Sequence, residues 1–334
     1  MAGRLPRVVV THWVHPQVAA YLEEFSVPVI PPEDPGLWAA ARIGELAGDA
    51  EGLIACMADR VDDAFLARCP RLRIIAATLK GYDNFDVAAC ARRGVWLTVV
   101  PDTIIAPTAE LAVGLVIGIM RRVGEADRTI RAAGFEGWRP RLYGSSLAGA
   151  TAGIIGMGDL GQSIARLLRA FGARIVYADP RPLPPDRQQE LAAARFGLDR
   201  LMSASDVIIA AVPLTPATRG LLGRDMLRLA RRGMFLVNVG RGSVVDEQAV
   251  ADALDENRLA GYAADVFAME DWALPGRPAA IPARLLSHPR TLFTPHLGSA
   301  VSDIRRVMSL TAARQVRQAL AGHRPDHAVN AVPA

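Results

Sequence analysis

Short apolar segments rich in β-branched residues alternate with longer stretches of helical periodicity along most of the chain. The first series of these segments lies at residues 7–11, 52–56, 74–78 and 95–99. Strands separated by helices are typical of parallel βαβ units rather than of a β-sandwich. The first hundred residues therefore predict one flavodoxin-like domain, which Pro101 closes.

A second series of strand segments follows the apolar stretch around residues 108–122. It is predicted at residues 152–155, 174–178, 207–212, 234–239, 262–266 and 291–294. Six strands with intervening helices complete a dinucleotide-binding fold. A last helix at 302–320 carries apolar residues mostly on one face, so we expect it to pack back on the first domain.

We therefore predict an α/β protein with two Rossmann-like or flavodoxin-like domains, each built on a parallel sheet. A discontinuous substrate domain would comprise residues 1–102 and 300–334, and a Rossmann domain would comprise residues 103–299. The length of 334 residues and the hydrophobic fraction of 51% suffice for two cores.

The longest apolar run, residues 111–120, is closed by Arg121 and Arg122. Ten residues fall short of the roughly 20 that a membrane span requires, so the run is interpreted as a buried helix. The N-terminal apolar stretch is too short for a secretory signal and leads directly into the first strand. We expect a cytoplasmic protein with no membrane partner.

Cys56, Cys69 and Cys90 show no metal-ligand spacing, and an odd number is unlike a disulfide framework. We expect small buried side chains and no metal. The net charge is +4, and the pI is about 9.3. Because arginines are scattered rather than clustered, we expect no nucleic-acid partner and favour a small anionic substrate.

A glycine motif, Gly156-Met157-Gly158-Asp159-Leu160-Gly161, follows the strand at 152–155 and opens a helix. In this context the first glycine permits a tight turn and the second lets the backbone approach a pyrophosphate. The third allows close packing of the helix, whose N-terminus favours an anion. We predict that Gly156, Gly158, Asp159, Leu160 and Gly161 bind the cofactor.

Asp179 ends the next strand, 18 residues beyond Gly161. A carboxylate at this place accepts hydrogen bonds from the ribose hydroxyls and repels a 2′-phosphate, which favours NAD. Arg181 lies two residues further on and could pair with a 2′-phosphate, so some use of NADP stays open.

Three residues of complementary chemistry follow apolar strands of the second series. Arg241 lies after residues 234–239, Glu270 after 262–266 and His296 after 291–294. Groups just beyond the carboxyl ends of parallel strands converge on the ligand crevice. In the predicted catalytic trio, His296 takes a proton, Glu270 orients the histidine and Arg241 holds an anionic substrate.

These motifs together resemble the D-isomer-specific 2-hydroxyacid dehydrogenases over essentially the whole chain. Several segments resemble more particularly the phosphite (phosphonate) dehydrogenases within that family: residues 79–86, 94–98, 240–247, 261–267 and 269–272. The resemblance implies oxidation of phosphite to phosphate with reduction of NAD, and a homodimer. The apolar helix at residues 111–120 is a candidate contributor to the dimer interface.

Carried over to this sequence, the resemblance makes Arg241, Glu270 and His296 catalytic. Lys80 and Met57 would line the substrate site, and Trp138, Tyr143 and Arg305 would lie near the substrate. We further expect Thr108, Pro213, Val239, Asp265 and Gly298 to contact the cofactor. Asp179 departs from the pattern, since the phosphite enzymes carry Glu there, and this affects only the preference between NAD and NADP.

Lys80 favours an oxyanion on physical grounds as well. Common hydroxyacid enzymes carry a small or neutral residue before the glycine of this loop, whereas phosphite approaches a dianion and gains from a second cation beside Arg241. The alternative is that Lys80 is a surface lysine paired with Asp83.

Two other functions stay open. The first is a conventional 2-hydroxyacid dehydrogenase of the glyoxylate or hydroxypyruvate reductase type, with the same fold, cofactor and trio. The second is a NAD-sensing binding protein similar to a corepressor.

Overall fold

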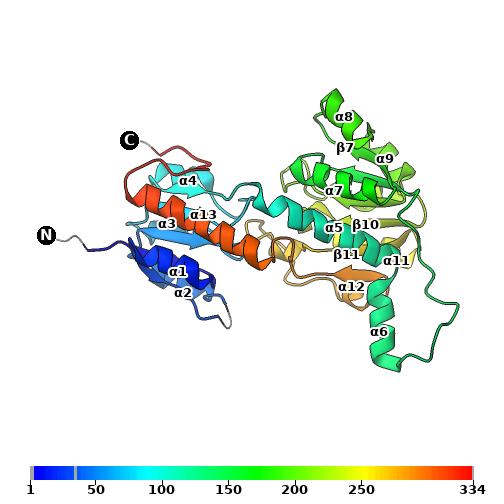
Figure 1. Ribbon diagram of the computed structural model, residues 1–334, viewed down its shortest axis with the longest axis horizontal. Helices are drawn as coiled ribbons and strands as arrows, with labels where there is room; N and C mark the ends of the chain where they lie inside the picture. Colours follow the sequence, from blue (N-terminus) through cyan, green and yellow to red (C-terminus); the bar gives the residue numbers. More distant parts are fainter. Residues whose placement is uncertain (1–3, 34–35, 333–334) are drawn as a thin grey trace. The chain divides into compact units, whose positions relative to one another are not determined.

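The computed structural model describes residues 4–33 and 36–332. The chain forms two compact units (Figure 1). Unit 1 comprises Met1–Ile104, Trp272–Pro275 and Ala300–Ala334, and unit 2 comprises Ile105–Asp271 and Gly276–Ser299. Each unit is built on its own parallel sheet, as the alternation of strands and helices predicts.

Unit 1 has a five-stranded sheet in the order β2-β1-β3-β4-β5. Its strands are β1 (Arg7–Val10), β2 (Val27–Val29), β3 (Gly52–Ala55), β4 (Ile74–Ala77) and β5 (Trp96–Thr98). Its helices are α1 (Pro16–Glu23), α2 (Ala40–Ala47), α3 (Asp63–Ala67), α4 (Val87–Arg92) and α13 (Ser302–Leu320), and the 3-10 turn η1 (Asp102–Ile104) follows β5.

Alternate side chains of the unit 1 strands face opposite layers of helices. Val9, Leu53 and Ile75 pack with apolar residues of α2, α3 and α4. Val8 and Ile54 pack with α1 and α13 on the other side. Burial on both faces explains why these strands are continuously apolar. Helix α13 therefore supplies part of the core of unit 1.

Unit 2 has a seven-stranded sheet in the order β12-β11-β10-β9-β6-β7-β8. Its strands are β6 (Thr151–Ile155), β7 (Arg174–Ala178), β8 (Ala193–Arg195), β9 (Val207–Ala210), β10 (Met234–Asn238), β11 (Leu259–Ala264) and β12 (Thr291–Phe293). The order reverses between β6 and β9, which makes a topological switch point at the centre of the sheet.

The helices of unit 2 form two layers. They are α5 (Ile105–Met120), α6 (Val123–Ala133), α7 (Asp159–Ala170), α8 (Pro185–Leu191), α9 (Leu198–Ala204), α10 (Arg224–Arg228), α11 (Glu247–Asp255) and α12 (Ala283–Ser287), with the 3-10 turns η2 (Gly242–Val244) and η3 (Ala268–Glu270). Apolar residues of α5 and α7 pack on one face of the sheet. Those of α9, α10, α11 and α12 pack on the other.

Two strands are absent from the sequence prediction, β2 in unit 1 and β8 in unit 2. Each has three residues and lies at an edge of its sheet. Pro28 lies within β2, and Arg195 ends β8 with an exposed side chain. Edge strands this short carry little periodicity, so the predicted set of six strands in unit 2 was incomplete.

The helical stretch Asp102–Met120 is longer than the apolar run that predicted it. By length and composition alone it could cross a membrane. Nine residues of α5, among them Leu115, Val116 and Ile119, are buried within the described structure, and most of them join the core of unit 2. The stretch is therefore accounted for as the core helix of a folded domain.

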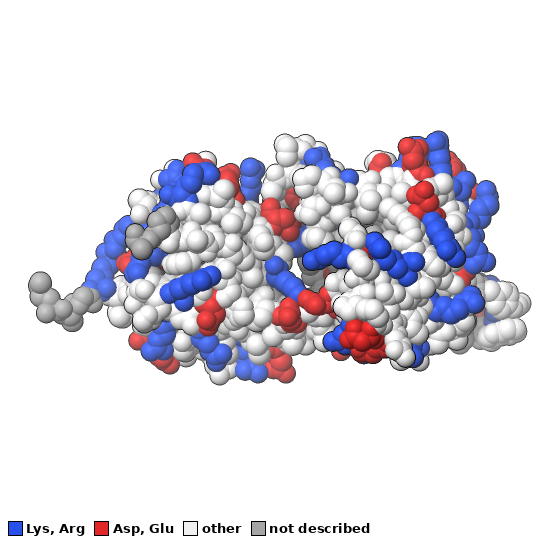
Figure 2. Space-filling model, turned by 90° about the horizontal axis from the view of Figure 1, so that it is seen from above, with Lys and Arg blue, Asp and Glu red and all other residues white. Residues whose placement is uncertain are grey.

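Charged side chains of both signs are interspersed over the face seen in Figure 2. This distribution agrees with the scattered arginines of the sequence. All three cysteines are buried and free, as expected. Among the described residues, no group of three or more His, Cys, Asp or Glu side chains could hold a metal ion.

Candidate active site

The glycine motif forms the turn between β6 and α7, and each glycine has a separate reason to be there. Gly156 has a φ of +90°, and a Cβ on Gly161 would lie 2.0 Å from the carbonyl oxygen of Gly156. A Cβ on Gly158 would meet nothing within 4 Å, so the backbone there is open to a ligand. The arrangement fits a dinucleotide pyrophosphate at the N-terminus of α7, where Asp159 and Leu160 begin the helix.

Asp179 follows β7 and is tied to this turn. Its Oδ2 accepts a hydrogen bond from the backbone N–H of Met157 at 2.8 Å, and its Oδ1 accepts from Arg181 N at 2.8 Å. The guanidinium of Arg195, on β8, donates to the carbonyl oxygens of Asp179 and Pro180. The loop that would receive the adenosine ribose is therefore held from both sides.

Glu270 and His296 meet in unit 2 as a hydrogen-bonded pair. Their Oε2 and Nδ1 atoms lie 2.7 Å apart, with side-chain exposures of 24% and 30%. Because a carboxylate can only accept, Nδ1 carries a proton in this bond, and in the neutral imidazole Nε2 has a lone pair. Glu270 is itself fixed by the N–H of Phe267, which donates to Oε1 at 2.8 Å. The pair is arranged for proton transfer at Nε2.

Asp265 shapes the loop that carries His296. Its Oδ1 accepts from Leu297 N at 2.7 Å and from Thr294 Oγ1 at 2.6 Å, and its Oδ2 accepts from Gly298 N at 2.9 Å. The backbone of His296 is left-handed, with a φ of +57°. This conformation is uncommon for a residue with a Cβ, so the buried carboxylate holds the histidine in a conformation that the loop alone disfavours.

Arg241 lies between β10 and η2, and its loop is packed directly on the turn that carries Glu270. A Cβ on Gly242 would lie 1.8 Å from the carbonyl carbon of Phe267 and 2.1 Å from Ala268 N. Ser243 N donates to Asp271 Oδ2 at 2.7 Å. The loops that follow β10 and β11 therefore form one closely packed body.

The remaining predicted cofactor residues lie around the carboxyl ends of the unit 2 strands. Val239 is buried at the end of β10, and the carbonyl oxygen of Pro213, after β9, accepts from Thr218 Oγ1 at 2.6 Å. Thr108, in α5, donates through Oγ1 to Gly298 O at 3.1 Å. The ends of β9 and β10 and the first turns of α5 and α7 belong to the edge of the sheet where ligands bind in such folds.

The predicted substrate residues are divided between the units. In unit 1, Lys80 Nζ lies 2.6 Å from Asp102 Oδ1, and Met57 O accepts from Asn84 Nδ2 at 3.1 Å. Arg305 lies in the first turns of α13, where burial lowers the pKa of its guanidinium. In unit 2, Trp138 and Tyr143 lie on the segment after α6 and are 76% and 73% exposed.

Sequence reasoning missed a buried polar cluster at the carboxyl ends of β1, β3 and β4. Asp59 Oδ2 accepts from Thr11 Oγ1 at 2.5 Å and from Cys56 N at 2.7 Å. Burial lowers the pKa of His12 to about 3, with a smaller contribution from the charge of Arg305, and raises the pKa of Cys56 to about 12. The imidazole and the thiol are therefore neutral near pH 7. Nothing in the sequence distinguishes these residues from other residues that follow a strand.

Comparison with known proteins agrees with this geometry. The profile of the D-isomer specific 2-hydroxyacid dehydrogenase NAD binding domain matches residues 113–298. A protein named glyoxylate reductase from Thermococcus kodakarensis is 36% identical over 287 residues, which cover 84% of each chain. Another of that name from Aeropyrum pernix is 35% identical and covers 97% of this chain and 96% of its own.

Solved structures show the same likeness. An NADPH-dependent glyoxylate/hydroxypyruvate reductase from Sinorhizobium meliloti, in complex with NADP and malonate, has a TM-score of 0.82 and 30% identity and covers 97% of this chain and 96% of its own. A protein from Thermus thermophilus has a TM-score of 0.82 and 31% identity, and covers 97% of this chain and 99% of its own. The chain therefore belongs to the D-isomer-specific 2-hydroxyacid dehydrogenase family and is an NAD-dependent oxidoreductase.

Proposed function

We propose that this enzyme oxidises phosphite to phosphate while NAD is reduced. The observation that carries the proposal is Arg305. Its guanidinium is shielded enough from water that its pKa is lowered, and no side chain among residues 4–33 and 36–332 forms a hydrogen bond or an ion pair with it. A desolvated cation without a counter-ion favours an anionic ligand.

Charge then separates the two candidate substrates. A 2-oxo acid such as glyoxylate carries one carboxylate, for which Arg241 alone is sufficient, whereas phosphite approaches a dianion. Lys80 contributes less positive charge toward an anionic substrate than the sequence alone suggests. Asp102 Oδ1 lies 2.6 Å from its Nζ and neutralises part of that charge. Arg305 is therefore stronger support for an oxyanion substrate than Lys80. Met57 is expected only to line the substrate site.

The resemblance implies that Arg241 and Lys80 bind phosphite oxygens and that Arg305 lies near the substrate. Bound NAD would supply the acceptor for the hydride of the P–H bond. His296 Nε2 takes a proton from the water whose oxygen bonds to phosphorus, and Glu270 stabilises the resulting imidazolium. Phosphite, water and NAD⁺ thus give phosphate, NADH and a proton.

The names of the relatives favour a second candidate, reduction of glyoxylate or a similar 2-oxo acid. Proteins named glyoxylate reductase are 33% to 36% identical to this chain over most of its length. In that direction protonated His296 would give its proton to the substrate oxygen, while Arg241 binds the carboxylate. The Glu270–His296 pair serves either reaction, so it does not decide between them.

The deciding experiment measures absorbance at 340 nm with purified protein. One arm contains NAD and phosphite, another NAD and D-lactate or D-glycerate, and a third NADH and glyoxylate or hydroxypyruvate. NADH formed with one equivalent of phosphate supports the phosphite proposal. Turnover of the organic acids without turnover of phosphite overturns it and establishes the second candidate.

We also propose that the protein is a cytoplasmic homodimer. Its support is a run of exposed apolar side chains after α6, where Phe135, Trp138 and Tyr143 are 70%, 76% and 73% exposed. Exposed apolar groups gathered in one segment favour a protein partner. Light scattering should give twice the chain mass of 35.7 kDa, and replacing Phe135 and Trp138 by Ser should weaken the dimer; a monomeric wild type contradicts it.

A further inference from the structure

Glu247 is a buried carboxylate beside the catalytic pair that the chemistry above leaves without a task. It is the first residue of α11 and is 6% exposed. Its Oε1 accepts a hydrogen bond from the backbone N–H of Ala268 at 2.8 Å. Ala268 begins the short turn η3, and Glu270 ends it. The carboxylate is therefore bonded to the start of the turn whose last residue holds His296.

Bonds within the turn close it but do not orient it in the unit. Glu270 N donates to Phe267 O at 2.9 Å, and Phe267 N donates back to Glu270 Oε1 at 2.8 Å. From outside, Arg277 Nη1 donates to Met269 O at 2.5 Å, and Ser243 N bonds to the side chain of the residue after the turn. The bond to Glu247 ties the start of the turn to α11.

The electrostatic setting of Glu247 is unfavourable. Burial raises the pKa of its carboxyl, and the negative charges of Asp271, Glu270 and Asp246 raise it further, while the bond from Ala268 N opposes this. Glu247 also lies near the buried phenol of Tyr262. Burial raises the pKa of Tyr262, and the negative charge of Glu247 raises it further. An acid that repels its neighbours is a poor source of stability, whereas a fixed hydrogen-bond acceptor at this place has a geometric use.

We propose that Glu247 is a positioning residue, whose carboxylate fixes the Ala268–Glu270 turn so that Glu270 stays within hydrogen-bonding distance of His296. The inference rests on the roles given above to Glu270 and His296. It does not depend on which anion is the substrate, because either reaction needs the same pair.

The experiment compares Glu247→Gln, which keeps an acceptor oxygen for Ala268 N, with Glu247→Met, which fills a similar volume and has none. Glu256→Ala, an exposed acid at the end of the same helix, is the matched control. Turnover is measured over pH with whichever substrate the wild type uses, and NADH affinity is measured by fluorescence titration. Displacement of a catalytic group by about 1 Å costs on the order of 100-fold in rate.

Glu247→Met should lower kcat by about 10-fold to 100-fold, while NADH affinity changes less than about 2-fold and KM changes little. Glu247→Gln and Glu256→Ala should stay within about 3-fold of the wild type in kcat, because neither removes the acceptor. A wild-type kcat in Glu247→Met overturns the proposal. So does an equal loss in Glu247→Gln with normal NADH binding, since the charge would then matter and the bond would not.

A readout without substrate separates this inference from the proposed function. Diethylpyrocarbonate reacts with neutral imidazole, so the rate at which it modifies His296, followed by mass spectrometry, reports the pairing with Glu270. In Glu247→Met the rate near pH 7 should rise by about 3-fold or more, because Nδ1 of His296 is no longer engaged in its hydrogen bond to Glu270. An unchanged rate contradicts the positioning role even if no substrate is found. If Glu247→Met does not fold, Glu247→Ala replaces it with the same expectations.

Discussion

Replacing Gly242 by Ala should disable the enzyme while leaving its cofactor site intact. The added Cβ would lie 1.8 Å from the carbonyl carbon of Phe267, 2.1 Å from Ala268 N and 2.2 Å from Phe267 O. All three are backbone atoms, so no side chain can rotate away. To reach the 3.0 Å that real Cβ contacts require, the two loops must separate by about 1.2 Å, which is 3.0 minus 1.8.

That displacement falls on the turn that carries Glu270, whose Oε2 lies 2.7 Å from His296 Nδ1. A shift of about 1 Å in a reacting group costs on the order of 100-fold in rate, and forced overpacking costs about 1–3 kcal/mol of stability. We therefore expect Gly242→Ala to lose about 100-fold in kcat and to keep its affinity for NADH, because the glycine turn at Gly156–Gly161 is not touched.

The assay is steady-state absorbance at 340 nm, with urea unfolding for stability. Gly197→Ala is the control, because a Cβ there meets nothing within 4 Å and the residue is exposed. It should keep wild-type activity. A folded Gly242→Ala enzyme with kcat within about 3-fold of the wild type would refute the reasoning that joins the Arg241 loop to the Glu270 turn.

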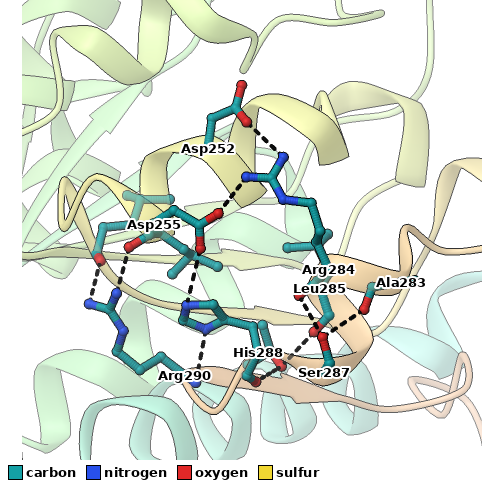
Figure 3. A network of polar contacts seen from close by, with 11 residues as sticks. Asp252, Asp255, Ala283, Arg284, Leu285, Ser287, His288 and Arg290 are labelled. Atoms are coloured by element: carbon teal, nitrogen blue, oxygen red, sulfur yellow. Dashed lines mark hydrogen bonds and ion pairs between the residues drawn. The ribbon is translucent and has the colours of Figure 1, made fainter.

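Three further predictions concern other parts of the chain. Asp179→Ala should weaken NADH binding by about 10-fold through loss of bonds to a charged acceptor and should narrow the difference between NADH and NADPH; fluorescence titration that shows an unchanged ratio of the two affinities contradicts this. The pKa of His12 is about 3 when folded and 6.5 in the unfolded chain, so its contribution to stability is complete above pH 6.5 and is lost as the pH falls toward 3. In urea titrations between pH 7 and 4.5, the free energy of unfolding of the wild type should fall by about 3 kcal/mol more than that of His12→Gln. The control His323→Gln, at an exposed histidine, should behave like the wild type. Arg284 pairs with Asp252 and Asp255 in the surface network shown in Figure 3. Arg284→Ala should lower the Tm slightly in low salt and not in roughly 1 M salt, because salt screens exposed ion pairs. A large decrease in Tm that does not depend on salt would contradict this.

Features encoded locally could be predicted from the sequence. Gly156, Gly158 and Gly161 lie between a strand and a helix, so their spacing alone predicts the turn. Glu270 and His296 follow strands that are neighbours in a doubly wound sheet, and the carboxyl ends of parallel strands share one edge. Their contact follows from topology, which the alternation of strands and helices already predicts.

Features that depend on tertiary contacts could not be predicted. Asp246-Glu247 looks like the acidic start of a helix, and nothing local indicates that Glu247 reaches Ala268, 21 residues away. The partner considered for Lys80 was Asp83, yet the structure also brings Asp102 to its ammonium group, 22 residues further along the chain. The neutral state of His12 arises from burial, which the sequence does not display.

The central claim is that the Glu270–His296 pair moves the proton in an NAD-linked oxidation or reduction. The most direct test measures turnover at 340 nm and NADH affinity for the wild type and His296→Asn, with phosphite and NAD and with glyoxylate and NADH. Asn cannot take up a proton, so activity in whichever direction the wild type supports should fall by about 100-fold or more, while NADH binds as before. Undiminished turnover by His296→Asn would contradict the account.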